Sequence, residues 1–442
     1  MPDASDPGCL VLTVDSIAVG GEGVARDDDG RVVFVPRTAP GDRVRARVLE
    51  AHPTWARAGA VEILAPGPDR RTAPCPHYER CGGCQLQHLE PAAQEAARRA
   101  AVADTLERIG GRDVEVEPIV APGPQLGYRN RVSLTLRRGE GASVTAGYHV
   151  RDDPARLLDV DRCPLAEEPV NAAWRALREA WGPGARRLPS GAELRLTLRA
   201  THEGSVGLLV EGGELDGSRK ESEASELLER VDELSSLHWR PEAGPLRRLA
   251  GAKRLEERWQ GIELSLHPAA FLQVNRTVAA RMEDHLDGLM GEVSGVRILD
   301  LYAGVGLRAM RWSERGADAV ACEVHPGAVE TGRRTARRHG VDVDMREGSV
   351  EEHVEQLLPA DTAVVNPPRQ GLSPEVAGSL GAAELAALAY VSCDPATLAR
   401  DLKRLGEAWR VESVQPFDAF PQTAHVETIV WLTRPDGTGA RG

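Results

Sequence analysis

The feature that most constrains the fold is a change of pattern at Val296, where a strand, a glycine loop and a helix follow one another. The stretch "GVRILDLYAGVGLRAMRWSERGADAVACEVHP" predicts a buried strand, then Gly304 and Gly306, then a helix and a second strand. Strands that alternate with helices in this way form a parallel sheet. We therefore predict an α/β domain with a Rossmann-like, mostly parallel sheet over residues 263–442.

The glycine loop predicts a site for a nucleoside. Glycines allow the backbone to turn tightly and approach a ligand, and Glu323 ends the next strand 17 residues after Gly306, where it can accept hydrogen bonds from a ribose. This pattern alone fits NAD as well as S-adenosylmethionine. Two features favour S-adenosylmethionine: Asp300 could meet a cationic amino-acid group, and "TAVVNPPRQGL" places Asn366 at the carboxyl edge of the sheet.

A cysteine follows another predicted strand at the same edge. In "AALAYVSCDPATLARDL" an apolar run stops at Ser392, and Cys393 precedes a new helical pattern. One reaction that needs both a thiol and a general base is methylation of carbon 5 of uracil. This carbon is a poor nucleophile until a thiolate adds to C6, and a base must afterwards remove the C5 proton. Glu427, in the strand-like run "FDAFPQTAHVETIVWL", is the candidate base, with His425 on the same face.

Four further cysteines indicate a metal centre. "CPHYERCGGCQLQH" and "LLDVDRCPL" supply Cys75, Cys81, Cys84 and Cys163. In a cytosolic chain such spacing indicates metal rather than disulfides, and four thiolates suit either zinc or an iron–sulfur cluster.

The N-terminal part has a different character. Short β-branched runs and Asp29-Gly30 in residues 10–65 predict a five-stranded barrel of the oligonucleotide-binding kind. No apolar run is long enough to span a membrane and the start lacks a signal peptide, so we expect a cytoplasmic protein. The net charge of −13 argues weakly against a nucleic-acid partner, but one basic patch stands out: Arg129, Arg131, Arg137, Arg138 and Arg151.

In combination these motifs resemble the RNA uracil-5 methyltransferases, the family of bacterial 23S rRNA and tRNA (uracil-5-)-methyltransferases. The resemblance covers nearly the whole chain, through "CGGCQLQH", "YRNR", "DVDRCPL", "FLQVN", "DLYAGVG", "NPPRQGL", "SCDPATLARDL" and "FPQTAHVET". It implies a class I S-adenosylmethionine-dependent methyltransferase domain, an N-terminal TRAM module and a central β-rich domain.

The resemblance also implies site residues. It makes Cys393 the nucleophile and Glu427 the base, and it puts a [4Fe-4S] cluster on the four cysteines named above. Contacts to the methyl donor are implied for six positions: Gln273, Tyr302, Gly304, Gly306, Glu323 and Asn366. Two positions depart from common forms of the family, since Leu307 stands where a polar residue is frequent and Asn366 stands where many members have aspartate.

We therefore expect a TRAM module over 1–66, a central domain with the cluster over 67–262, and the methyltransferase domain over 263–442, with the helix of residues 91–109 packed on the last. The expected activity is methylation of C5 of a uridine in RNA by a monomer, with 23S rRNA favoured over tRNA. Two rivals are an amino-group methyltransferase that uses the NPP motif and a non-catalytic RNA-binding protein.

Overall fold

The computed structural model describes residues 8–215 and 217–434. The N-terminal residues form a closed barrel with strand order β1-β2-β3-β5-β4, in which only β3 and β5 pair in parallel. Alternate apolar side chains, such as Leu12, Val14 and Val33, fill its interior because successive residues of a strand face opposite sides. The strands are β1 (Cys9–Ile17), β2 (Glu22–Arg26), β3 (Val32–Pro36), β4 (Arg43–Ala51) and β5 (Trp55–Ala65).

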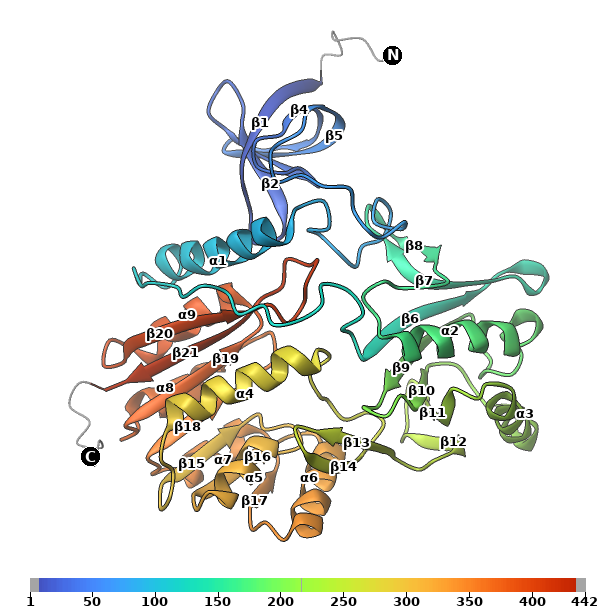
Figure 1. Cartoon of the computed structure of the whole chain (residues 1–442), viewed down its shortest axis with the longest axis vertical. Helices are drawn as coiled ribbons and strands as arrows, with labels where there is room; N and C mark the ends of the chain where they lie inside the picture. Colours follow the sequence, from blue (N-terminus) through green and yellow to red (C-terminus); the bar gives the residue numbers. More distant parts are fainter. Residues whose placement is uncertain (1–7, 216, 435–442) are drawn as a thin grey trace.

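The central domain is a mixed seven-stranded sheet with the order β12-β11-β10-β9-β6-β7-β8. The helices α2 (Glu168–Ala180) and α3 (Gly217–Arg230) pack on one face, around Trp174 and the leucines of β6 and β9. Its strands are β6 (Arg131–Arg138), β7 (Val144–Val150), β8 (Asp153–Asp159), β9 (Glu193–Ala200), β10 (Val206–Glu211), β11 (Leu234–Arg240) and β12 (Arg247–Gly251); the short 3-10 turns are Glu140–Ala142 and Pro183–Ala185. The other face of this sheet is turned toward the C-terminal domain (Figure 1).

The C-terminal domain confirms the predicted α/β fold. Its sheet has the order β17-β16-β15-β18-β19-β21-β20, parallel except for β21, which runs antiparallel to both of its neighbours. Because the chain moves outward from β15 in one direction and then from β18 in the other, the switch point lies between these two strands. The strands are β15 (Arg297–Leu301), β16 (Asp318–Glu323), β17 (Asp344–Glu347), β18 (Thr362–Val365), β19 (Ala387–Ser392), β20 (Arg410–Phe417) and β21 (Glu427–Thr433).

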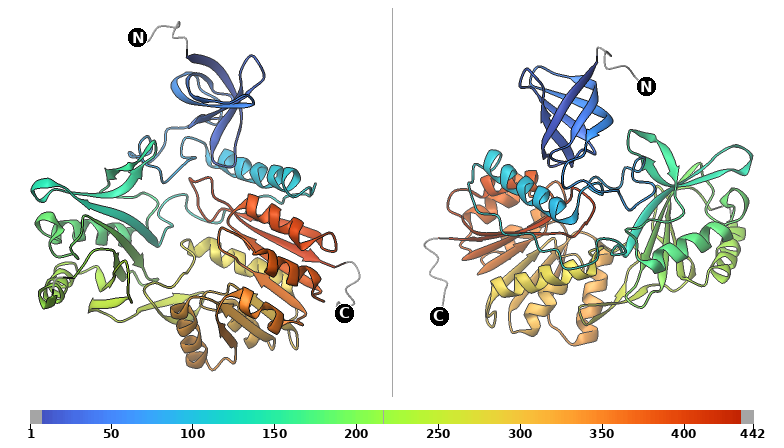
Figure 2. Two further views of the ribbon diagram at one scale, coloured as in Figure 1. Left: turned by 180° about the vertical axis from the view of Figure 1, so that it is seen from behind. Right: turned by 45° about the horizontal axis from the view of Figure 1, so that its top comes forward.

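Helices cover both faces of this sheet (Figures 1 and 2). One face packs α1 (Pro91–Arg108), α7 (Val350–Leu357), α8 (Pro374–Ala382) and α9 (Pro395–Leu405). The other packs α4 (Arg276–Met290), α5 (Leu307–Glu314) and α6 (Pro326–His339). The α1 helix lies against α9, and the hairpin of β13 (Leu255–Trp259) and β14 (Ile262–Leu266) contacts α6. The domain boundaries after residues 66 and 262 stay predictions.

Among the described residues, no helix is both long and apolar enough to cross a membrane.

Candidate active site

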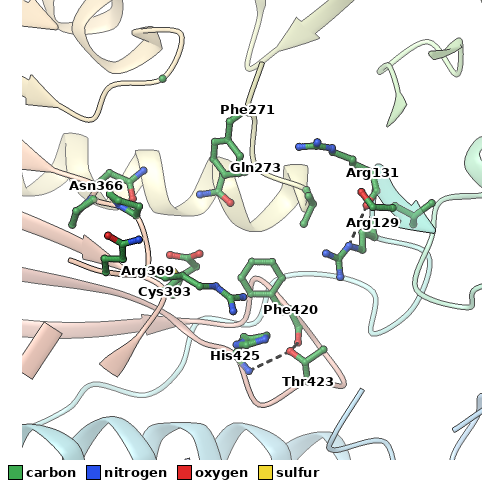
Figure 3. A pocket seen from close by; sticks show the side chains of 18 of the residues that line it. Arg129, Arg131, Phe271, Gln273, Asn366, Arg369, Cys393, Phe420, Thr423 and His425 are labelled. Carbon is green, nitrogen blue, oxygen red and sulfur yellow. Dashed lines mark hydrogen bonds between the residues drawn. The ribbon is translucent and has the colours of Figure 1, made fainter. Parts of the chain in front are cut away.

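A cleft of about 1260 Å³ opens between the central sheet and the carboxyl edge of the C-terminal sheet. It exceeds the usual size of a small-molecule pocket, roughly 300–1,000 Å³, so more than one ligand group fits inside it. The segments that follow β15, β16, β18 and β19 line one side, where ligands bind in open α/β sheets. Figure 3 shows side chains from both domains pointing into this space.

The glycine loop lies directly after β15 and contacts the end of β16. The backbone N–H groups of Gly304 and His325 donate to the two carboxylate oxygens of Glu323, at 2.9 and 2.8 Å, and so fix the loop and the acid together. Gly304 and Gly306 both have positive φ, and a Cβ added to Gly304 would meet no atom within 4 Å. This open space beside the loop and the buried Tyr302 hydroxyl, which has no hydrogen-bond partner in the described chain, suit a polar nucleoside ligand.

Asp300 does not occupy the position expected of it. Its side chain is fully buried beneath the loop and is not among the residues that line the cleft. Burial raises the pKa of this carboxyl to about 7, partly opposed by Arg308, whose guanidinium is itself held by Glu283 at 2.9 Å. The expectation that Asp300 meets the cationic group of a ligand is therefore wrong, because the sequence does not reveal which side of the strand end is covered.

Gln273 and Asn366 approach the cleft from two sides (Figure 3). Asn366 immediately follows β18, as the proline turn predicts, and its backbone N–H donates to Leu301 O at 3.2 Å. Gln273 lies on the segment between β14 and α4, where its carbonyl accepts a hydrogen bond from the Asn130 side chain at 3.2 Å.

Cys393 and Glu427 are neighbours across two strands. Ser392 pairs with Thr428 in the antiparallel ladder of β19 and β21, so the next residues outward, Cys393 and Glu427, face each other. Since β21 is antiparallel, its first residue lies at the edge where β19 ends. Asp394 caps α9 by accepting from Thr397 N–H at 2.8 Å, which fixes the short turn that presents the thiol.

The electrostatics of this pair come mainly from burial. Glu427 is 4% exposed, and desolvation raises the pKa of its carboxyl to about 7 although Arg308 and Arg369 act against the shift. Burial raises the pKa of the Cys393 thiol to about 11; the Glu427 carboxylate adds to the rise, and Arg369 opposes it. A carboxyl with a pKa near neutrality is suited to proton transfer.

The predicted strand that carries His425 is interrupted. The chain from Asp418 to Val426 forms a loop between β20 and β21, so the expectation that His425 and Glu427 share one strand face is wrong. Pro421 is the signal that favours a turn here. Both side chains nevertheless line the cleft, and the ring of Phe420 meets His425 edge-on at 6.0 Å (Figure 3).

Two lining residues escaped the sequence reasoning. Arg369, the residue after the NPP motif, opposes the rise in pKa of both Cys393 and Glu427. Phe420 sits in a motif that the resemblance includes, but nothing in its spacing indicates a ring that lines the cleft.

The four cysteines gather at the other end of the same cleft: Cys75, Cys81, Cys84 and Cys163. As they lie, no group of three His, Cys, Asp or Glu side chains within residues 8–215 and 217–434 could hold a metal ion. Burial, with the neighbouring thiolates, raises the pKa values of the first three thiols. In donor chemistry, four thiols around one cavity suit either zinc or an iron–sulfur cluster.

The sheet order, the reversed strand β21 and the glycine-loop site define a class I S-adenosylmethionine-dependent methyltransferase. Two family models match the chain, the TRAM domain over residues 10–61 and tRNA (uracil-5-)-methyltransferase over residues 355–435. The chain is 33% identical to an uncharacterised RNA methyltransferase of Gloeobacter violaceus, across 97% of this chain and 98% of that protein.

Two further relatives carry more specific descriptions. The 23S rRNA (uracil(1939)-C(5))-methyltransferase RlmD of Chromohalobacter salexigens is 32% identical across 97% of this chain and 90% of its own length. The crystal structure of Pyrococcus abyssi tRNA (uracil-54, C5)-methyltransferase in complex with S-adenosyl-L-homocysteine superposes with a TM-score of 0.73 at 25% identity, covering 96% of this chain and all of that one. The chain belongs to the RNA (uracil-5-)-methyltransferase family.

Proposed function

We propose that the protein methylates C5 of a uridine in 23S rRNA through a covalent bond between Cys393 and C6 of the base. The observation that carries this proposal is the pairing of a thiol with a buried carboxyl, across β19 and β21, at the edge of a methyl-donor site. The similarity to the Chromohalobacter enzyme over nearly the whole chain favours 23S rRNA. The target base leaves its stack to reach the cleft.

In this proposal the two residues act in sequence. The Cys393 thiolate adds to C6, and the electron pair of the C5–C6 bond makes C5 nucleophilic. S-adenosylmethionine supplies an electrophilic methyl group: C5 bonds to this methyl carbon as the carbon–sulfur bond of the donor breaks, and S-adenosylhomocysteine leaves with the electron pair. Glu427 then accepts the proton from C5, the C5–C6 double bond re-forms and the thiolate leaves, so the proton ends on Glu427 and the sulfur regains its electron pair.

The donor contacts are assigned to the residues around the glycine loop. Glu323 accepts from the ribose hydroxyls, and the backbone of Gly304 and Gly306 allows close approach. Tyr302, Gln273 and Asn366 supply polar groups at the remaining sides of the cleft, and Asn366 does so without the charge of an aspartate.

We assign a [4Fe-4S] cluster to Cys75, Cys81, Cys84 and Cys163. The shared cavity and the absence of a disulfide among these cysteines support it. Broad absorption near about 400 nm that disappears on chelation would support iron, whereas a colourless protein with bound zinc would contradict the assignment.

The decisive experiment traps the covalent intermediate. With Glu427→Gln the C5 proton stays in place, so methylated RNA should remain bound to the protein after denaturation, with label from the methyl donor in the complex. Cys393→Ala should give neither complex nor methylated RNA. Steady turnover by Cys393→Ala would instead support the amino-group methyltransferase.

The likeness to the Pyrococcus tRNA enzyme makes tRNA the second candidate. Mapping 5-methyluridine in rRNA and tRNA of a strain lacking the gene separates the two, because only the true substrate loses the modification. Loss confined to tRNA would contradict the rRNA assignment.

A further inference from the structure

The cleft-facing side of the central sheet carries an unusual set of charges. Along β6 and β9 the residues alternate, and the apolar set packs on α2 in the domain core. The opposite set is polar and contains four cross-strand pairs: Arg131 with Arg199, Ser133 with Thr197, Thr135 with Arg195, and Arg137 with Glu193, of which only the last is an ion pair, at 2.7 Å. Arg131, Ser133 and Arg195 line the same cleft as Cys393.

The pair of Arg131 and Arg199 places like charges directly opposite each other, which is unfavourable in a sheet. Arg199 is 3% exposed, and its Nε and Nη2 atoms have no hydrogen-bond partner among the described residues. Arg131 likewise makes no ion pair with any carboxylate in the described chain. Burial and Arg131 lower the pKa of Arg199 to about 9, despite the opposing effect of Glu257.

Neighbouring carboxylates neutralise only part of this face. Arg195 lies 3.7 Å from Glu211, but the same carboxylate also holds Arg240. Arg129, two residues before β6, donates its Nε–H to the carbonyl of Arg131. The other buried arginine of the described chain, Arg98, has a carboxylate partner, Asp418, at 2.6 Å. In a chain of net charge −13, uncompensated arginines collected at one cavity indicate a missing anion.

We propose that the β6–β9 face binds the phosphate backbone of the substrate RNA, with Arg131 and Arg195 on separate phosphates. The inference rests on the proposed function and extends it to how the RNA is held. Arg131 and Thr135, the partner of Arg195, are four residues apart, about 13 Å along the strand, which is too far for one phosphate. Arginine and hydroxyl groups are the usual phosphate contacts, and Ser133, which lines the cleft, lies between the two arginines.

The position of this face indicates that it binds the RNA segment that carries the target uridine. Figure 3 shows Arg131 and Arg129 across the cleft from Cys393. When a base is turned out toward Cys393, its flanking phosphates remain near the mouth, where this face can hold them. Arg199, buried behind, adds charge without touching solvent.

The test is the salt dependence of binding to a single-stranded oligouridylate of about 12 nucleotides, a probe that does not depend on which uridine is modified. Each lost phosphate contact should reduce the slope of log K against log salt by about 0.7. We expect this reduction for Arg131→Gln and for Arg195→Gln, and about 1.4 for the double variant. Arg131→Lys keeps the charge and should keep the slope.

The matched control is Arg410→Gln, at the first residue of β20 and therefore at the opposite edge of the C-terminal sheet. Its slope should equal that of the unmodified protein. Equal slopes for Arg131→Gln and Arg410→Gln, or a slope for Arg131→Lys as low as that for Arg131→Gln, would overturn the proposal. If Arg131→Gln unfolds at a lower temperature than the unmodified protein, the salt dependence of Arg195→Gln decides the question, because Arg195 is more exposed.

Methylation kinetics provide a separate readout. Arg131→Gln should raise the KM for RNA and leave kcat at saturating RNA unchanged, because the contact positions the backbone and does not touch the reacting base. If the proposed function is wrong, no variant should transfer a methyl group to uridine, but the variants should still differ in the slope of log K against log salt.

Discussion

At the scale of single residues, the reactivity of Cys393 depends on a cation that the sequence did not reveal. Arg369 opposes the rise that burial and Glu427 impose on the thiol pKa. Since Arg369 is exposed, water screens its charge and the effect should be modest. We expect Arg369→Gln to slow alkylation of Cys393 by iodoacetamide at pH 8 about threefold, measured by mass spectrometry of the Cys393 peptide. An unchanged rate relative to Arg410→Gln would contradict this.

Glu427 also makes stability depend on pH. Its pKa is about 7 in the folded protein against 4.5 for the free side chain, so the folded state binds the proton more tightly. This contribution is fully present below pH 4.5 and is lost as the pH rises through 7. At pH 8, the free energy of unfolding measured in urea should therefore be greater for Glu427→Gln than for the unmodified protein, by on the order of 3 kcal/mol. Near pH 4.5 the two proteins should unfold at the same urea concentration. A variant less stable at pH 8 would show that the carboxylate has an unrecognised partner.

The placement of individual residues at the cleft was predictable where residue type and local context agree. Cys393 follows a buried strand and precedes a capped helix, and Glu427 is an acid at the start of an apolar run, so both could be found in the sequence. Asp300 shares this context, yet it is sealed beneath the glycine loop. Burial of that kind depends on the packing of α5, which local pattern does not specify.

At the scale of elements, the loop between β20 and β21 is held from outside its own domain. Gln422, buried and with φ of 73°, accepts at its carbonyl from the backbone N–H groups of Gln85 and Leu86. Its side chain bonds Gln94 of α1 and Gln125 at 3.0 Å each. The loop that leads into Glu427 is thus fixed by segments more than 290 residues away in the chain.

Gln422→Ala should therefore impair catalysis more than binding. We expect kcat to fall about a hundredfold, since small displacements of a reacting group are costly, while affinity for S-adenosylmethionine is unchanged. Amide exchange in residues 418–427 should accelerate. The control is Gln415→Ala, which removes only hydrogen bonds to Pro118 and Pro416 carbonyls. Unchanged exchange in the loop would contradict the role of Gln422.

The same loop shows why this element was mispredicted. The run from Phe417 to Leu432 has the apolar content of a strand, and only Pro421 indicates a break. The conformation of Gln422 is stabilised by partners in α1 and beside Cys84, and contacts between distant segments leave no periodic trace in the sequence.

At the scale of the whole molecule, the segment of Cys75 to Leu89 joins all three parts. Arg37 of the barrel donates to Cys81 O and lies 3.9 Å from the centre of the Tyr78 ring. The backbone of Cys81 forms an isolated β-bridge with Val150 of the central sheet. The backbone N–H of Gln85 donates to the carbonyl of Gln422, in the loop between β20 and β21. The sequence predicted three types of structure in the right order, but not that one short segment meets them all.

The thiols of this segment should consequently stabilise the packing of the barrel, the central domain and the C-terminal domain against one another. Cys84→Ser removes a proposed cluster ligand one residue from Gln85, so we expect faster protease cleavage within residues 66–90 and a larger radius of gyration in solution scattering. The methyltransferase domain has its own core, and S-adenosylmethionine should still bind. Cys9→Ser, in the barrel and outside the cysteine group, should leave cleavage unchanged. Identical cleavage of the two variants would show that the barrel, central sheet and catalytic loop stay joined without the cluster.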